Sequence, residues 1–390
     1  MPDELQLSIQ NFKSIDGLEL ALGRVNLLIG ENGCGKSNIL EAIAMATAAV
    51  LDQLDNAALK DRGIRLAEST WMRSAFSPAT RTMPVAIRAR TSTTRMNVQL
   101  QHDNSPYGLW SHLLPPADAT PGGLRTCLQQ LGTDDRTSLV EFLGSEKEWP
   151  ARPQSPSYHL FATSWLRTLA IHLGLADYLT YAPREDVLRD LARDSDVEPI
   201  GIHGEGLFKL LQVLDSEGQL PLVKEQLALL GWFDDLSVAS GVNPSSRALQ
   251  IRDVFIDGDA PFDQRSANEG FLFVLLYACL LISKYTPRFF AVDNVDTALN
   301  PKLCARTVKM FAELSKTYDR RVLLTAHNPG ALDGLDLHDD EQRLFVVYRN
   351  TEGRTQARRI LPADLPAGGE PLRLSEAFLR GYLGALPTNF

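Results

Sequence analysis

The spacing of apolar residues predicts short strands in the first hundred residues of the chain. Residues 5–22 read as two short strands around a turn, with apolar and polar residues alternating over 5–9 and again over 18–20. A third apolar run, over 25–29, has the length of a strand. A pair of strands is expected over 85–89 and 96–101. This part of the chain is therefore expected to be rich in β-structure.

Helical spacing dominates the middle of the chain. A first helix is expected from residue 37, and later helices are expected over 165–179, 187–192, 206–215 and 220–230. Proline and glycine are frequent over 105–157, which predicts a loop-rich stretch with one helix near 124–142. We therefore expect three parts: an N-terminal lobe over 1–105, a mostly helical insertion over 106–245 and a C-terminal lobe over 246–390.

The C-terminal lobe alternates strands with helices. An apolar helix over 271–282 precedes a short buried strand, and a β-rich run follows over 321–325 with one helix between. The order strand, helix, strand predicts a parallel α/β sheet. Two further strands, over 343–348 and 355–360, flank a hairpin signal, and a terminal helix is expected over 374–382.

The stretch 30–37, GENGCGKS, carries the most specific motif of the chain. It follows a strand and opens a helix, which is the context that a phosphate-binding P-loop, G-x-x-x-x-G-K-S, requires. Its glycines let backbone N–H groups turn toward phosphate oxygens, Lys36 reaches the β- and γ-phosphates, and the Ser37 hydroxyl holds Mg²⁺. Because strand, loop and helix agree, we reject a chance glycine-rich turn. The residues expected to contact ATP are Gly30, Glu31, Asn32, Gly33, Cys34, Gly35, Lys36, Ser37 and Asn38.

The overall composition is ordinary for a globular protein, and it argues against a membrane protein and a secreted, disulfide-rich protein. Hydrophobic residues make up 44% of the 390 residues, and charged residues make up 22%. No apolar run approaches the roughly 20 residues of a membrane helix, and the N-terminus carries no secretory signal. The four cysteines are scattered without metal-ligand spacing, so no disulfide framework is expected. These features predict a cytoplasmic protein without membrane contact.

A net charge of −9 argues against a generally basic, nucleic-acid-binding surface. Any contact with DNA would have to be local. Two local clusters of arginine exist, and we interpret both as solvated strand faces rather than binding patches. The first cluster comprises Arg81, Arg88, Arg90 and Arg95, and the second comprises Arg349, Arg354, Arg358 and Arg359.

The two lead-in strands, with Phe12-Lys13-Ser14 ahead of the P-loop, resemble the ATP-binding heads of SMC, RecF and ABC-type ATPases, and especially their compact bacterial AAA-family relatives. The resemblance implies an α/β fold, a P-loop NTPase of the ABC/SMC head type, here interrupted by the mostly helical insertion. It also implies three further motifs, in a fixed order, downstream of the P-loop. No heptad pattern extends beyond two or three repeats, which excludes a long coiled-coil arm.

The first of these motifs resembles the signature loop of ABC-type ATPases, which binds the γ-phosphate held by an opposite subunit. The sequence SANEG over 266–270 stands directly before the apolar helix, but it lacks the usual double glycine. By itself, a serine or asparagine before an apolar helix is also ordinary helix capping. The resemblance implies nucleotide contacts by Ser266, Asn268, Glu269 and Gly270.

The second motif resembles the Walker B strand, which ends in an acid that binds Mg²⁺. Asp293 holds this position at the end of an apolar run. ABC-type heads place a glutamate next, which orients or activates the attacking water, whereas this chain has Asn294. An amide cannot act as a general base. Asp296 matches the last acid of a similar string in some compact relatives and is a candidate substitute; otherwise hydrolysis is slow, and ATP mainly holds a dimer together.

The third motif resembles the switch histidine that contacts the γ-phosphate in ABC-type ATPases. His327 follows the β-rich run over 321–325, one helix beyond the acid strand. A lone histidine at a strand end is more often structural, but its place in the strand–helix–strand order favours the switch role. The catalytic candidates are therefore Lys36, Asp293, Asn294, Asp296 and His327, with Ser37 and Asp293 as metal ligands.

The four motifs together imply an ATPase that works as a homodimer or higher homo-oligomer, because one subunit's P-loop and another's Ser266 loop would share each ATP. Compact heads of this kind resemble ATPase subunits of prokaryotic antiphage defence systems of the Septu or PARIS type. Such subunits act with a separate nuclease or toxin, and no nuclease signature is evident in this sequence. Two alternatives stay open: a RecF-like DNA repair or recombination ATPase, and an ATP-gated scaffold with little or no hydrolysis.

Overall fold

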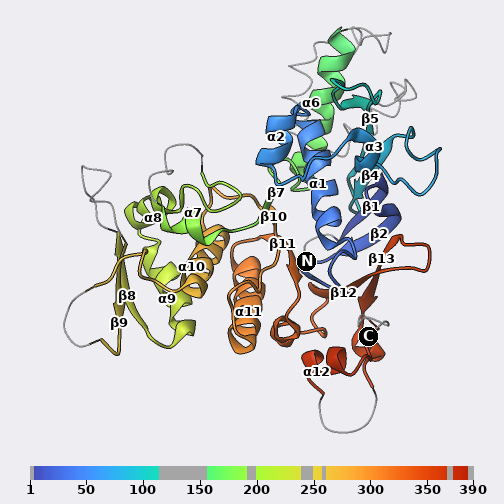
Figure 1. The fold of residues 1–390 in the computed structure, drawn as a ribbon. Helices are drawn as coiled ribbons and strands as arrows, with labels where there is room; N and C mark the ends of the chain where they lie inside the picture. Colours follow the sequence, from blue (N-terminus) through green and yellow to red (C-terminus); the bar gives the residue numbers. More distant parts are fainter. Residues whose placement is uncertain are drawn as a thin grey trace. The chain divides into compact units, whose positions relative to one another are not determined.

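The computed structural model describes residues 4–113, 156–190, 199–238, 249–256, 261–366 and 372–384 (Figure 1). The helix expected near 124–142 lies outside these residues. The chain divides into two compact units, which are considered separately. Unit 1 comprises residues 1–21, 41–60 and 64–177, and unit 2 comprises residues 22–40, 61–63 and 178–390. The sequence of the predicted insertion, 106–245, is therefore shared between the two units.

Unit 1 is built on a five-stranded sheet in the order β2-β1-β4-β5-β6. Strand β1 pairs antiparallel with β4, β4 with β5, and β5 with β6. Buried residues alternate with more exposed ones along most of β1 and β5, as the sequence pattern predicts. The elements are β1 (Leu5–Phe12), β2 (Ile15–Leu22), β4 (Val85–Arg90), β5 (Arg95–Gln101), β6 (Ser111–Leu113), α2 (Asn56–Asp61), α3 (Ser69–Met72) and α6 (Pro156–His172).

Helix α6 ends earlier than the sequence predicts. The expected helix ran to residue 179, but α6 ends at His172, and Leu179 begins strand β7 (Leu179–Tyr181). Gly174 has a φ of 70°, and its N–H donates to the carbonyl of Ile171. A glycine in this left-handed conformation is a common way to end a helix. The predicted end of this helix is therefore wrong.

Unit 2 contains a six-stranded sheet in the order β13-β12-β3-β11-β10-β7. Strands β12, β3, β11, β10 and β7 are parallel, and β13 runs antiparallel at the edge. This confirms the predicted parallel α/β sheet and the predicted hairpin. Every residue of β3 is buried, as is typical of a central parallel strand. The new strands are β3 (Val25–Ile29), β10 (Phe289–Val292), β11 (Arg321–Ala326), β12 (Gln342–Arg349) and β13 (Thr355–Ile360).

Two helices accompany this sheet in the sequence order that the motifs predict. In α10 (Glu269–Ile282) every residue from Gly270 onward is buried, so its apolar character all round matches its surroundings. Helix α11 (Pro301–Thr317) begins with Asn300 as N-cap and proline at its first position. The remaining elements are α1 (Lys36–Val50), α7 (Glu185–Arg189), α8 (Leu207–Ser216), α9 (Leu220–Leu227), η2 (Ala228–Leu230), β8 (Phe233–Val238), β9 (Leu249–Asp253), η4 (Pro329–Gly334), η5 (Pro362–Asp364) and α12 (Leu374–Leu379).

Neither unit contains, among the described residues, a helix that is both long and apolar enough to cross a membrane. The three described cysteines, Cys34, Cys279 and Cys304, are buried free thiols.

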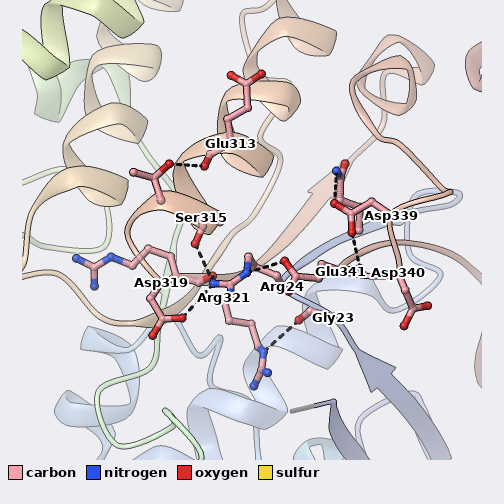
Figure 2. A network of polar contacts seen from close by, with 12 residues as sticks. Gly23, Arg24, Glu313, Ser315, Asp319, Arg321, Asp339, Asp340 and Glu341 are labelled. Carbon is pink, nitrogen blue, oxygen red and sulfur yellow. Dashed lines mark hydrogen bonds and ion pairs between the residues drawn. The ribbon is translucent and has the colours of Figure 1, made fainter. Parts of the chain in front are cut away.

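A network of charged groups holds the start of β3 (Figure 2). Arg24, just before this strand, donates from Nε to the Glu341 carboxylate (3.0 Å) and from Nη1 to Asp319 (3.1 Å). Arg321, at the start of the neighbouring strand β11, donates to the carbonyl of Gly23 (3.1 Å). These contacts tie β3 and β11 together at their amino ends. They help to set the register of β3 against β11, and this register helps to position the P-loop at the carboxyl end of β3.

Candidate nucleotide-binding site

The P-loop leaves the carboxyl end of β3 and leads into α1. Gly33 and Gly35 have φ values of 76° and 111°, a region that glycine adopts without steric cost. Lys36 is only 5% exposed, and its Nζ donates to the carbonyls of Gly30 (2.8 Å) and Glu31 (3.0 Å). The ammonium group therefore sits within its own loop, where an incoming phosphate oxygen would compete for it.

Ser37 and Asp293 meet although they stand 256 positions apart in the chain. The Ser37 hydroxyl donates to Oδ2 of Asp293 over 2.8 Å. Thr325, on the strand between β3 and β10, donates to Oδ1 of the same carboxylate over 2.6 Å. The Asp293 N–H donates to the carbonyl of Tyr181 (2.8 Å). A hydroxyl and a carboxylate at this spacing are the hard oxygen ligands that Mg²⁺ prefers, so these two residues fit the ion.

Asn294 occupies the position at which the resemblance to ABC-type heads implies a glutamate. It has a φ of 57°, its side chain is exposed, and its N–H donates to the Thr325 hydroxyl (2.8 Å). Asparagine tolerates this left-handed conformation better than most residues. Thr325 thus orients both Asp293 and the turn that follows it. Sequence reasoning did not single out Thr325; its only signal is a hydroxyl residue within an otherwise apolar strand.

Asp296 holds the loop that carries His327. Its Oδ2 accepts the backbone N–H groups of His327 (2.9 Å) and Asn328 (2.6 Å). Its Oδ1 is buried and has no hydrogen-bond partner among the described residues. This carboxylate therefore connects the turn after β10 to the end of β11, and it keeps one oxygen unsatisfied.

The charged groups of the site act on one another. His327 is exposed, but partial desolvation of its ring lowers the pKa of the imidazole, and the charge of Lys36 lowers it further, whereas Asp296 and Asp293 act in the opposite direction. Burial also lowers the pKa of Lys36, against the same two carboxylates. The P-loop lysine, the acid after β10 and the predicted switch histidine therefore share one site in unit 2.

The predicted signature loop lies at the amino end of α10. Asn268 caps this helix, because its side-chain oxygen accepts the Phe271 N–H over 2.8 Å. This is the capping role that the sequence left open, and it does not exclude a nucleotide contact. Ser266 is exposed, and its N–H donates to the carbonyl of Asp263 (3.1 Å). A cavity of about 610 Å³ adjoins the loop and is lined by Asn268, Glu269 and Gly270, among other residues.

A parallel sheet with a P-loop after one strand, an acid after another and a histidine after the strand between them defines a P-loop NTPase head. Comparison with known families agrees. The profile of the family described as "AAA domain, putative AbiEii toxin, Type IV TA system" matches residues 25–333. The chain therefore belongs to this family, and it has the fold of an SMC-type P-loop head.

One solved structure of an SMC head shares this fold, and two others are reported with it. A crystal structure of an SMC head bound to the C-winged helix domain of ScpA has a TM-score of 0.51 and 14% identity, covering 93% of this chain and 99% of that chain. The SMC head domain from Thermotoga maritima (TM-score 0.45, 14% identity, 92% and 99% covered) and an SMC head with an extended coiled coil, bound to the C-terminal domain of ScpA from Pyrococcus furiosus (0.48, 13%, 93% and 97%), also match. No curated protein matches the sequence significantly.

Proposed function

We propose that this protein binds ATP with Mg²⁺ at the P-loop and hydrolyses it slowly. The observation that carries the proposal is the contact between Ser37 and Asp293, with Lys36 held in the same loop. Bound Mg²⁺ would supply charge neutralisation at the β- and γ-phosphates. Ser37 and Asp293 would hold the ion, and Lys36 would exchange the Gly30 carbonyl for phosphate oxygens.

Slow turnover follows from the residue after the Walker B acid. The Asn294 amide cannot take a proton from the attacking water. Asp296 is the nearby carboxylate that is not a proposed ligand of Mg²⁺; its Oδ2 accepts from the His327 loop, and its Oδ1 is buried without a hydrogen-bond partner among the described residues. We therefore assign the general base to Asp296, in a position that also has to hold that loop. His327 would contact the γ-phosphate as a neutral imidazole.

Phosphate release by the purified protein tests this assignment. We expect Lys36→Ala to lose both ATP binding and turnover, and Asp296→Asn to keep ATP binding but lose at least tenfold in turnover. Asn294→Glu restores a carboxylate at the usual position, so it should raise turnover by roughly a hundredfold, a typical gain from a positioned general base. Tight ATP binding with negligible turnover in the unmodified protein would favour the ATP-gated scaffold instead.

We further propose that two copies assemble around ATP and that this assembly controls a separate effector, a nuclease or toxin, in antiphage defence. The family description names a toxin of a type IV toxin–antitoxin system, and the SMC head in one similar structure binds a domain of another protein, ScpA. A RecF-like role in DNA repair is the alternative.

Co-purification with the products of neighbouring genes, with and without ATP, tests the partner. We expect a complex whose amount depends on ATP and is lost in Lys36→Ala. If no complex forms, and ATP instead stimulates a salt-dependent affinity for duplex DNA, the repair role is favoured.

A further inference from the structure

The hairpin formed by β12 and β13 contacts the P-loop through a pair of side chains. Arg349 and Thr355 lie directly opposite each other in the last ladder pair before the turn. Arg349 donates from Nε to the carbonyl of Gly33 over 2.9 Å. Thr355 donates from Oγ1 to the carbonyl of Cys34 over 2.8 Å. One cross-strand pair thus binds two consecutive carbonyls of the P-loop.

These two contacts determine the direction of N–H groups within the loop. In a trans peptide the C=O and the following N–H point in opposite directions. Binding the carbonyls of Gly33 and Cys34 from the hairpin side therefore turns the N–H groups of Cys34 and Gly35 away from the hairpin. The Cys34 N–H donates to the carbonyl of Glu31 within the loop (3.3 Å), so the Gly35 N–H is the one that this geometry leaves to face an anion. A phosphate-binding loop works by aiming such N–H groups at the anion.

The hairpin also approaches the first glycine of the motif closely. A Cβ atom added at Gly30 would lie 2.0 Å from the carbonyl oxygen of Val347 in β12. Thr355 is fully buried, whereas Arg349 is exposed and also donates to the carbonyl of Gly353 in the turn (3.3 Å). The P-loop is therefore packed against the hairpin at its start and bonded to it in its middle.

We propose that Arg349 and Thr355 are positioning residues of the nucleotide site, which orient the N–H groups of the P-loop without touching the nucleotide. This inference rests on the proposed binding of ATP at the P-loop. It predicts that nucleotide affinity depends on the hairpin, while the catalytic step, once ATP is bound, does not.

Paired substitutions separate positioning from general stability. Thr355→Val removes the donor and keeps the shape, and Thr355→Ser keeps the donor. For Thr355→Val and for Arg349→Gln we expect ATP affinity, measured by calorimetry, to fall roughly five- to tenfold, the size of one lost hydrogen bond. Thr355→Ser should stay within about twofold. In steady-state assays KM should rise while kcat is kept.

Hydrogen exchange of the P-loop amides in nucleotide-free protein gives a readout that does not need ATP. Exchange over 30–37 should be faster in Thr355→Val and Arg349→Gln than in Thr355→Ser and the unmodified protein. Arg354→Gln is the matched control, because Arg354 stands in the same hairpin but pairs with Glu352 (3.2 Å). Arg349→Gln changes an exposed side chain, so it keeps the test valid if Thr355→Val fails to fold.

Unchanged exchange and unchanged ATP affinity in folded Thr355→Val and Arg349→Gln would overturn the inference. If instead the proposed ATP binding at the P-loop is wrong, the measurements give a different result. In that case the unmodified protein and Lys36→Ala bind ATP equally poorly, while the exchange measurement still decides whether the hairpin orders the P-loop.

Discussion

Asp296 connects two parts of the site at the scale of single residues. One of its carboxylate oxygens accepts the N–H groups of His327 and Asn328, and the other is buried and has no hydrogen-bond partner in the part of the chain that the structure describes. A change at this carboxylate therefore alters the loop of His327 as well as the charge beside it. For each Asp296 variant, both the rate of ATP turnover and the pKa of His327 should be measured.

The pKa of His327 is the first quantity to measure at this scale. Because partial desolvation and Lys36 lower it, we expect the imidazole to titrate below its ordinary value of about 6.5. Below about pH 6.5 the unfolded chain therefore binds more protons than the folded one, so acidification should lower the free energy of unfolding. NMR of the histidine ring protons, assigned with His327→Gln, gives the midpoint.

On acidification from about pH 7 to pH 5, the free energy of unfolding should fall less in His327→Gln than in the unmodified protein, because the variant has no imidazole at this position to take up a proton. Asp296→Asn removes a charge that favours the imidazolium, so it should lower the midpoint of His327 further. A midpoint at or above 6.5 in the unmodified protein would contradict the expected lowering of the His327 pKa and the assignment of a neutral imidazole.

The second arginine cluster shows that like charges close together in the sequence do not by themselves indicate a binding surface. Arg349 bonds the P-loop, Arg354 pairs with Glu352, and Arg358 donates to the carbonyl of Leu383 (3.0 Å). Arg359 pairs with Asp340. The members of this cluster thus have separate partners within unit 2. In unit 1, Arg88, Arg90 and Arg95 line a cavity of about 610 Å³ on the sheet, and our interpretation of a solvated face remains a prediction.

At the scale of elements, β3, β12 and the P-loop depend on a close backbone approach. Gly30 stands where a side chain would meet the carbonyl of Val347 at 2.0 Å. Since that neighbour is backbone in a paired strand, it cannot move aside without distorting the ladder between β12 and β3. The first glycine of the motif is thus required by packing as well as by phosphate binding.

Gly30→Ala should therefore lower the free energy of unfolding by about 2–3 kcal/mol, measured by urea denaturation without nucleotide. Gly17→Ala is the matched control, because nothing lies within 4 Å of the added Cβ there. It should leave stability unchanged or raise it slightly. Equal unfolding midpoints for Gly30→Ala and the unmodified protein would show that β12 gives way at this contact.

At the scale of the whole molecule, the proposed composite site predicts a change of mass on binding ATP. Because turnover is expected to be slow, ATP with Mg²⁺ should convert the protein to a dimer or larger assembly, whereas ADP should not. Ser266→Arg places a bulky charge on an exposed position of the signature loop, so it should block assembly while leaving ATP binding intact.

Light scattering coupled to gel filtration measures this mass directly. Ser216→Arg, at an exposed position at the end of α8, is a control that should assemble normally. If Ser266→Arg assembles with ATP as well as the unmodified protein does, the predicted loop is not part of a shared site.

Most of the elements of both units follow from local pattern. Apolar spacing and turn residues correctly predict the strands over 25–29, 289–292 and 321–326. They also predict the apolar helix that precedes the last two of these strands and the hairpin that follows them. Strand β7 and the antiparallel pair of β8 and β9 were not predicted, and β7 and β8 lie within the stretch that was expected to be mostly helical. Short strands of this kind are stabilised by the neighbours that they pair with, which local sequence does not reveal.

The sequence by itself determined the P-loop, because the residues that make it are contiguous and their types follow from phosphate chemistry. It also determined the order of the other motifs. Only the tertiary structure decided which groups meet: Ser37 with Asp293 across 256 positions, and Thr355 with Cys34 across 321. Those contacts depend on the strand order β12-β3-β11-β10, which pairing and packing select and no local pattern encodes.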